Sequence, residues 1–174
     1  MEKTIKIKIK SIQYDIDGLG SELFFSEDGT PYTAKKGAAH GNGDKNSVPT
    51  SNTIELESEG LLKVEDGRLE ISYEETELTG MAGSTTAVSF AEDTPGLVSM
   101  IREGSVNTVL VFEQSKRNIC VYETEYMPFE ICIHTYNIEN NLTRDGGTLS
   151  LDYVIEIHGS ATERTRFTLE VKTI

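Results

Sequence analysis

The second half of the chain alternates apolar and polar residues over long stretches. One side of the first stretch carries Leu149, Leu151, Tyr153, Ile155 and Ile157. After a short turn the same pattern resumes in Phe167, Leu169 and Val171. A period of two residues is typical of β-strands with one face on a core and the other in water. The pattern predicts an architecture and carries no chemistry.

The same alternation predicts strands along most of the chain. The first is expected over 4–13, with a phase shift near Ser11 that suggests a bulge or bend. Later strands are expected over 54–58, 61–64, 69–74, 84–91, 97–102, 106–113, 118–124 and 129–136, before the last two. Asp66-Gly67 is a strong hairpin signal, and a turn is expected over 93–96.

The expected strands total roughly ten, their connections are short, and no convincing helix separates them. Regularly spaced short strands predict an all-β antiparallel sandwich or barrel. Because most strands follow one another as hairpins, and because closure removes exposed edges, an up-and-down barrel of about 8–10 strands is favoured.

Residues 17–52 interrupt the alternation with a run of Gly, Asp, Asn and Pro. We expect one long loop here, with a short strand at 23–25. Long unstructured loops are uncommon in compact domains and are usually functional or mobile. A length of 174 residues suits one domain. The chain is therefore expected to form a single domain over 1–174, with a loop insertion at about 17–52.

The net charge of −13 argues against nucleic acid as the main partner, because binding requires basic groups that neutralise phosphates. Lys3, Lys6, Lys8 and Lys10 alternate with isoleucines. A solvated strand face explains them better than a nucleic-acid arm. No apolar run is long enough for a signal peptide or a membrane span, so we expect a cytoplasmic protein.

Cys120 and Cys132 are expected to be reduced thiols in that compartment. A disulfide between them is also possible, because in one register the two residues could face each other across a hairpin. The cysteines and the three histidines lack the close spacing of a zinc site, so no metal site is expected.

Several short motifs occur in a characteristic order. They are Leu69–Glu75, Gly83-Ser84-Thr85-Thr86, Arg102-Glu103-Gly104, Phe112-Glu113, Tyr122-Glu123-Thr124, Thr135 and Gly147–Tyr153. In that order and spacing the chain resembles the YwiB-like proteins, a bacterial domain family of unknown function. The resemblance covers about 54–171 and, more loosely, the first strand. It implies a calycin-like (lipocalin-like) β-barrel and no established reaction or ligand.

The chain departs from the family pattern in two places. Glu125-Tyr126-Met127 stands where Pro-Tyr-Gly is expected after Tyr122, so that turn differs. The loop at 17–52 is also much longer than expected, and it could cover the mouth of the barrel.

Arg102 is the first candidate site residue, because it ends a strand just before a turn. From there it could reach into the barrel mouth and hold a ligand carboxylate by paired hydrogen bonds. Alternatively, it pairs with Glu113 or Glu123 and closes the end of the barrel.

Tyr73, Tyr122 and Tyr153 are the other candidate ligand-binding residues, since each offers an apolar ring with a hydroxyl that could orient a ligand. Tyr73 and Tyr153 lie on the apolar phase of their strands, which also fits a plain core role. The side that Tyr122 faces stays open.

No catalytic motif stands out. The sequence lacks a Gly-x-Ser-x-Gly elbow, a phosphate-binding loop and His-Glu-x-x-His. His134 and His158 have no evident partner that would make either a general base. We therefore expect no enzyme, no catalytic residue and no cofactor.

The leading interpretation is a non-enzymatic barrel that binds a small, partly apolar or amphipathic ligand. A barrel of this size holds one small ligand or is filled by its own side chains, here including Phe90, Phe112, Phe129 and Phe167. The alternative is a structural or protein-interaction module that acts through its acidic surface and the 17–52 loop. Its partner would be basic or dimeric, and a homodimer stays open.

Overall fold

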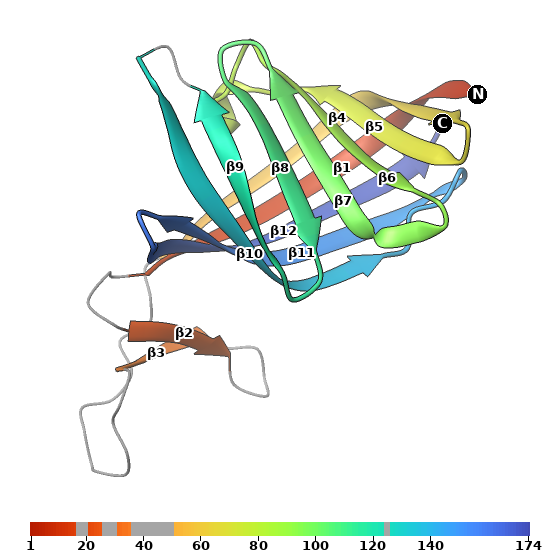
Figure 1. Cartoon of the computed structure of the whole chain (residues 1–174). Helices are drawn as coiled ribbons and strands as arrows, with labels where there is room; N and C mark the ends of the chain where they lie inside the picture. Colours follow the sequence, from red (N-terminus) through yellow and green to blue (C-terminus); the bar gives the residue numbers. More distant parts are fainter. Residues whose placement is uncertain (17–20, 26–30, 36–50, 124–125) are drawn as a thin grey trace.

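The chain folds as a closed antiparallel β-barrel (Figure 1). The structure is a computed structural model that describes residues 1–16, 21–25, 31–35, 51–123 and 126–174. Around the barrel the strands follow the order β1-β12-β11-β10-β9-β8-β7-β6-β5-β4, and β4 pairs with β1 to close it. The predicted up-and-down barrel is confirmed, with ten strands.

The barrel strands differ in length, and the longest lie next to the two termini. They are β1 (Glu2–Asp15), β4 (Ser51–Glu65), β5 (Arg68–Glu74), β6 (Thr85–Ala91), β7 (Thr94–Glu103), β8 (Asn107–Glu113), β9 (Arg117–Glu123), β10 (Pro128–Asn140), β11 (Gly146–Ile157) and β12 (Ser160–Thr173). A short 3-10 turn, η1 (Glu77–Thr79), follows β5. None of the helical segments in the described residues is long and apolar enough to cross a membrane.

Two further strands lie within the predicted loop at 17–52. β2 (Ser21–Phe25) and β3 (Pro31–Lys35) pair with each other in a separate two-stranded sheet. The short strand expected at 23–25 is thus confirmed within β2. The loop prediction is wrong at residues 31–35 and 51–52, which form β3 and the start of β4. The remaining positions, and a loop that covers the mouth, fall on residues outside the described ranges. The division into one domain with an insertion stays a prediction.

The turns explain where strand boundaries were predicted correctly and where they were not. Asp66 and Gly67 have φ values of 48° and 75°, the left-handed pair that a tight hairpin needs. The expected turn at 93–96 is wrong. Ala91 pairs with Thr94, so the turn is Glu92-Asp93 and β7 already includes Pro95. Proline is tolerated there because it stands near the start of a strand.

The predicted bulge near Ser11 is also wrong. β1 pairs in unbroken register with β4 and β12 through this region, so no residue is inserted. Ile9 is buried, whereas Ser11 and Gln13 on the same phase line a cavity. The change in the sequence pattern marks the point where the inner face of β1 passes from packed core to cavity wall.

One end of the barrel is filled by apolar side chains. The largest fully buried ones are Phe112, Ile5, Leu62, Leu69, Ile71, Met100, Ile133, Leu149, Leu151, Leu169, Val88 and Val98. This packed end lies on the side of the two termini (Figure 1). Burial of such side chains is the main stabilising contribution to a domain of this size. We call the opposite end, where β1 ends and β4 begins, the mouth.

The two cysteines face opposite sides of the sheet. Cys120 stands opposite Ile131, and Cys132 stands opposite Ile119 in the β9–β10 register. Because neighbouring strand positions alternate between faces, Cys120 is buried inside and Cys132 lies on the outer face. Both thiols are free, so this register rules out the disulfide that the sequence left open.

Candidate functional site at the barrel mouth

A cavity of about 440 Å³ occupies the mouth. Its apolar wall consists of Ile9, Ile54, Val106, Leu110, Phe129, Ile131, Ile155, Ile157 and Phe167, with Met81 beside η1. This volume lies within the range of about 300–1,000 Å³ that is usual for small-molecule sites. The barrel is thus packed at one end and hollow at the other. Phe112 belongs to the packed core, whereas Phe129 and Phe167 line the cavity.

The four candidate residues from the sequence all line this one cavity. Tyr73 comes from β5, Arg102 from β7, Tyr122 from β9 and Tyr153 from β11. The open question of Tyr122 is answered, since it stands opposite Thr108 and Phe129 and faces inward. The structure brings these residues together, and their binding of a ligand stays a prediction.

The partner of Arg102 is Glu75, not Glu113 or Glu123. Arg102 Nε lies 3.7 Å from Glu75 Oε1, and the two side chains are only 13% and 2% exposed. Glu113 stands near the packed end of β8, and the exposed Glu123 ends β9. The pairing therefore crosses from β7 to the residue that follows β5.

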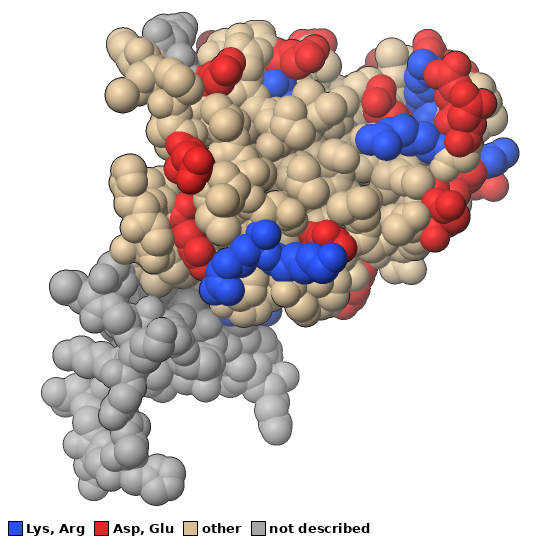
Figure 2. All heavy atoms as spheres, in the orientation of Figure 1, with Lys and Arg blue, Asp and Glu red and all other residues tan. Residues whose placement is uncertain are grey.

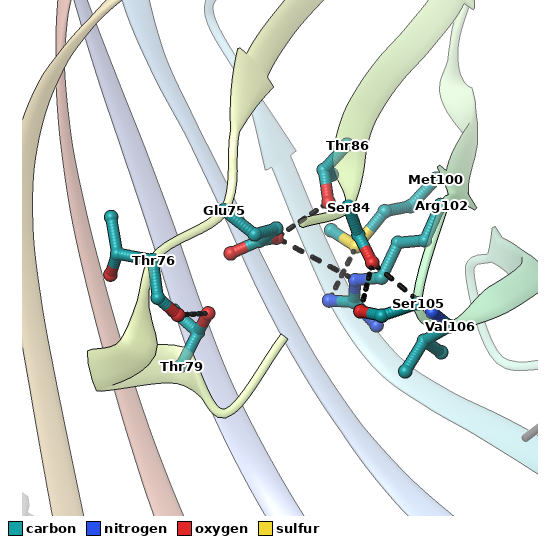
Figure 3. A network of polar contacts seen from close by, with 9 residues as sticks. All are labelled: Glu75, Thr76, Thr79, Ser84, Thr86, Met100, Arg102, Ser105 and Val106. Carbon is teal, nitrogen blue, oxygen red and sulfur yellow. Dashed lines mark hydrogen bonds and ion pairs between the residues drawn. The ribbon is translucent and has the colours of Figure 1, made fainter. Parts of the chain in front are cut away.

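Glu75 and Arg102 form the centre of a small polar network (Figure 3). Thr86 Oγ1 donates a hydrogen bond of 2.5 Å to Glu75 Oε1, and Arg102 Nη2 lies 3.2 Å from Met100 Sδ. At 3.7 Å the ion pair is too long to be a hydrogen bond. Within the described part of the chain, Glu75 Oε2 and Arg102 Nε have no hydrogen-bond partner.

Unpaired buried polar atoms are rare in folded proteins, and each one requires an explanation. Here a charged donor and a charged acceptor lie side by side at the wall of a cavity. A group that entered the cavity with one acceptor and one donor would satisfy both. This is the chemical property that distinguishes the mouth from the packed end.

Two of the cavity tyrosines, Tyr73 and Tyr153, have phenols with a raised pKa. Burial raises the pKa of the Tyr73 phenol above its ordinary value, and the Glu75 carboxylate raises it further. Burial also raises the pKa of Tyr153, although Arg102 acts in the opposite direction. The Tyr153 ring lies 4.8 Å from that of Phe112, between core and cavity.

Two of the motifs that support the family resemblance meet beside Arg102. Ser84 Oγ lies 2.8 Å from Ser105 Oγ and accepts a hydrogen bond of 3.1 Å from the Val106 amide (Figure 3). Gly104 has φ of 137°, and a Cβ there would stand 2.2 Å from the Gly83 carbonyl oxygen. Glycine is therefore needed where these two segments touch, and their contact fixes the end of β7 that carries Arg102.

Two acidic residues of the cavity were missed by sequence reasoning. Glu75 continues the inward phase of Ile71 and Tyr73, so the alternation itself could have placed it inside. Glu163 lines the cavity and accepts a hydrogen bond of 2.8 Å from Thr165 Oγ1. Glu163 lies at an alternate position from the inward-facing Phe167, so the alternation of β12 could likewise have placed it inside the barrel.

His134 lies on the outer face, away from the cavity. Its ring is 4.4 Å from that of Tyr136, over which the Arg164 guanidinium lies at 4.7 Å. Burial lowers the pKa of His134, and the positive charge of Arg117 lowers it further. Among the described residues, no three His, Cys, Asp or Glu side chains gather as a metal site would require.

Comparisons with known proteins identify a family and a fold. The family model described as "Domain of unknown function (DUF1934)" matches residues 41–169. The chain is similar to the crystal structure of the ywiB protein from Bacillus subtilis, with a TM-score of 0.65 and 19% sequence identity. That similarity covers 99% of this chain and 94% of the other. No curated protein matches the chain.

Proposed function

The chain belongs to the family described as Domain of unknown function (DUF1934), and we propose that its barrel binds one small, partly apolar ligand at the mouth without catalysing a reaction. The observation that carries this proposal is the pair of unpaired buried atoms, Glu75 Oε2 and Arg102 Nε, at the cavity wall. Leaving a buried polar atom of a charged group without a hydrogen-bond partner is costly, so a ligand that paired with these two atoms would be stabilised by them.

The body of the ligand would be apolar. Most of the wall consists of aliphatic and aromatic side chains, among them Leu110, Ile155 and Phe129. Transfer of apolar surface from water to such a wall contributes roughly 25 cal/mol per Å². The tilted ring pair of Tyr122 and Phe129, with centroids 5.3 Å apart, adds aromatic surface to this wall.

The polar end of the ligand would be a neutral group that both accepts and donates, such as an amide. Its carbonyl oxygen would accept from Arg102 Nε, and its N–H would donate to Glu75 Oε2. A ligand carboxylate, which Arg102 alone would favour, fits less well. It would bring a further negative charge close to Glu75, in a cavity that Glu163 also lines.

Native mass spectrometry of the freshly purified full chain, compared with its denatured mass, tests the proposal. We expect an additional small mass that is lost on denaturation. The Ile155→Phe variant, in which a larger ring enters the cavity, should carry this mass at much lower occupancy. Leu61→Glu, on the outer face of β4, should retain it.

Two results would count against binding at the mouth. One is a bare wild-type mass after a purification without detergent. The other is an additional mass that Ile155→Phe retains at full occupancy, since the ligand would then lie elsewhere. The alternative role as an interaction module through residues 17–52 stays a prediction, because most of that segment lies outside the described residues.

A further inference from the structure

The outer face of β7, β8 and β9 is apolar over its centre. Its outward-facing positions include Leu97, Ile101, Val109, Val111, Ile119 and Val121. Ile119 is 70% exposed, Val121 is 52% exposed and Val109 is 49% exposed. Figure 2 looks onto this face and shows uncharged atoms across its centre, with acidic and basic groups toward its edges. We call it the β8–β9 face.

The outer face on β1 and β4 is very different. There Lys8 pairs with Glu57 at 3.4 Å, and Lys10 pairs with Glu55 at 2.9 Å. Outward positions of an antiparallel barrel are normally polar, as they are on these strands. A contiguous exposed apolar area on a soluble domain usually marks an interaction site. Within the described surface, the β8–β9 face is therefore a candidate interaction site.

The outward residues of β9 form a pattern that is complementary to itself. They are Arg117, Ile119, Val121 and Glu123, so a cation ends one side and an anion ends the other. Cys120 lies at the midpoint of this run. If a second copy is turned by 180° about that midpoint, Arg117 meets Glu123 and Ile119 meets Val121. Both contacts occur twice, as a twofold interface requires.

The charges near the two ends of the run fit the same arrangement. At the Arg117 end, Lys116 is 61% exposed while its partner Glu113 is only 35% exposed, so the cation is the more accessible group. The Arg117 side chain is likewise more exposed than its partner Glu156. At the other end the exposed carboxylates of Glu103, Glu123 and Glu130 lie near one another in the register.

We propose that the chain forms a twofold homodimer through the β8–β9 face. Chains of net charge −13 repel one another, so contact is most favourable where the surface carries few charges. Burial of the apolar centre supplies the attraction, and the Arg117–Glu123 contacts fix the relative orientation. This proposal is independent of the mouth cavity, because the residues that carry it face outward.

Sedimentation velocity of the full chain over a range of concentrations tests the proposal. We expect the wild type to shift from monomer to dimer as concentration rises. Ile119→Glu should raise the dissociation constant of the dimer at least about tenfold, because it places a charge at the centre of the interface. Leu61→Glu adds the same charge to β4 and should leave the dimer unchanged. Thermal unfolding confirms that both variants are folded.

A charge-swap experiment tests the orientation. Arg117→Glu alone and Glu123→Lys alone should each weaken self-association, because like charges then meet twice. An equimolar mixture of the two variants should restore the dimer, since every contact in the mixed dimer joins opposite charges. Failure of the mixture to associate would overturn the proposed orientation.

Two other results would overturn the homodimer itself. If the wild type stays monomeric at every accessible concentration, the homodimer proposal is wrong, and the β8–β9 face would have to bind a different protein. A dimer that Ile119→Glu does not weaken would place the interface elsewhere.

Discussion

At the scale of single residues, Arg102 and Glu75 determine the character of the mouth. Arg102 lies on the inward phase of β7, and Glu75 continues the inward phase of β5 just beyond its end. The other inward positions of these strands are apolar or small. A buried ion pair contributes little net stability, because desolvation offsets the attraction. Each of the two side chains has one unpaired atom at the cavity wall, and the binding proposal rests on these two atoms.

Removal of Arg102 alone should destabilise the protein, because it leaves the Glu75 carboxylate buried without its counter-charge. We expect Arg102→Met to lower the free energy of unfolding by about 3 kcal/mol. The double variant Glu75→Gln with Arg102→Met should recover most of this loss, because no unpaired charge remains. Chemical denaturation of the wild type and the two variants measures both effects. A double variant less stable than Arg102→Met would contradict this account.

Tyr73 should stay protonated in the folded protein at alkaline pH. Its folded pKa is raised above the unfolded value near 10, so its contribution to stability is present below that pH. The contribution is lost as pH rises above about 10, because the unfolded chain then releases its proton more readily. Absorbance of tyrosinate during an alkaline titration should show one fewer phenol ionising on unfolding in Tyr73→Phe. If the substitution instead removes a phenol that titrates near pH 10 in the folded state, the prediction fails.

At the scale of elements, the contact between the β7–β8 turn and the segment before β6 holds Arg102 in place. Gly104→Ala would force a side chain into the Gly83 carbonyl at a φ that alanine rarely adopts. We expect it to lower the free energy of unfolding by roughly 2 kcal/mol or more. Gly96→Ala, near the start of β7, has open space and should change stability by less than about 1 kcal/mol. Equal effects in thermal denaturation would contradict this role for Gly104.

The strands were predictable because a barrel with one buried face imposes alternation on nearly every one of them. The same alternation extends to Glu75 and Glu163, so the two missed residues were accessible from sequence. The partner of Arg102 could not be predicted from the sequence, because Glu113 and Glu123 are closer to Arg102 in the chain than Glu75 is. Which strands are neighbours, and where β5 ends, decides the pairing. Likewise, only the register placed Cys120 and Cys132 on opposite faces.

At the scale of the whole molecule, the barrel has two different ends and two different sides. One end is packed with apolar side chains, and the other holds a cavity with a polar centre. The outer face is charged on β1 and β4 and apolar on β8 and β9. The cavity and the β8–β9 face are therefore two separate candidate surfaces, and variants of one should leave the other intact.

Binding of a matched pair of fluorescent probes tests the central claim most directly. N-phenyl-1-naphthylamine is neutral and has one N–H donor, and anilinonaphthalene sulfonate is the same skeleton with an added negative charge. We predict that the neutral probe binds once per chain and more tightly than the sulfonate. Ile155→Phe should weaken its binding, whereas Ile119→Glu on the outer face should not. Equal binding of the neutral probe by wild type and Ile155→Phe would contradict a ligand site at the mouth.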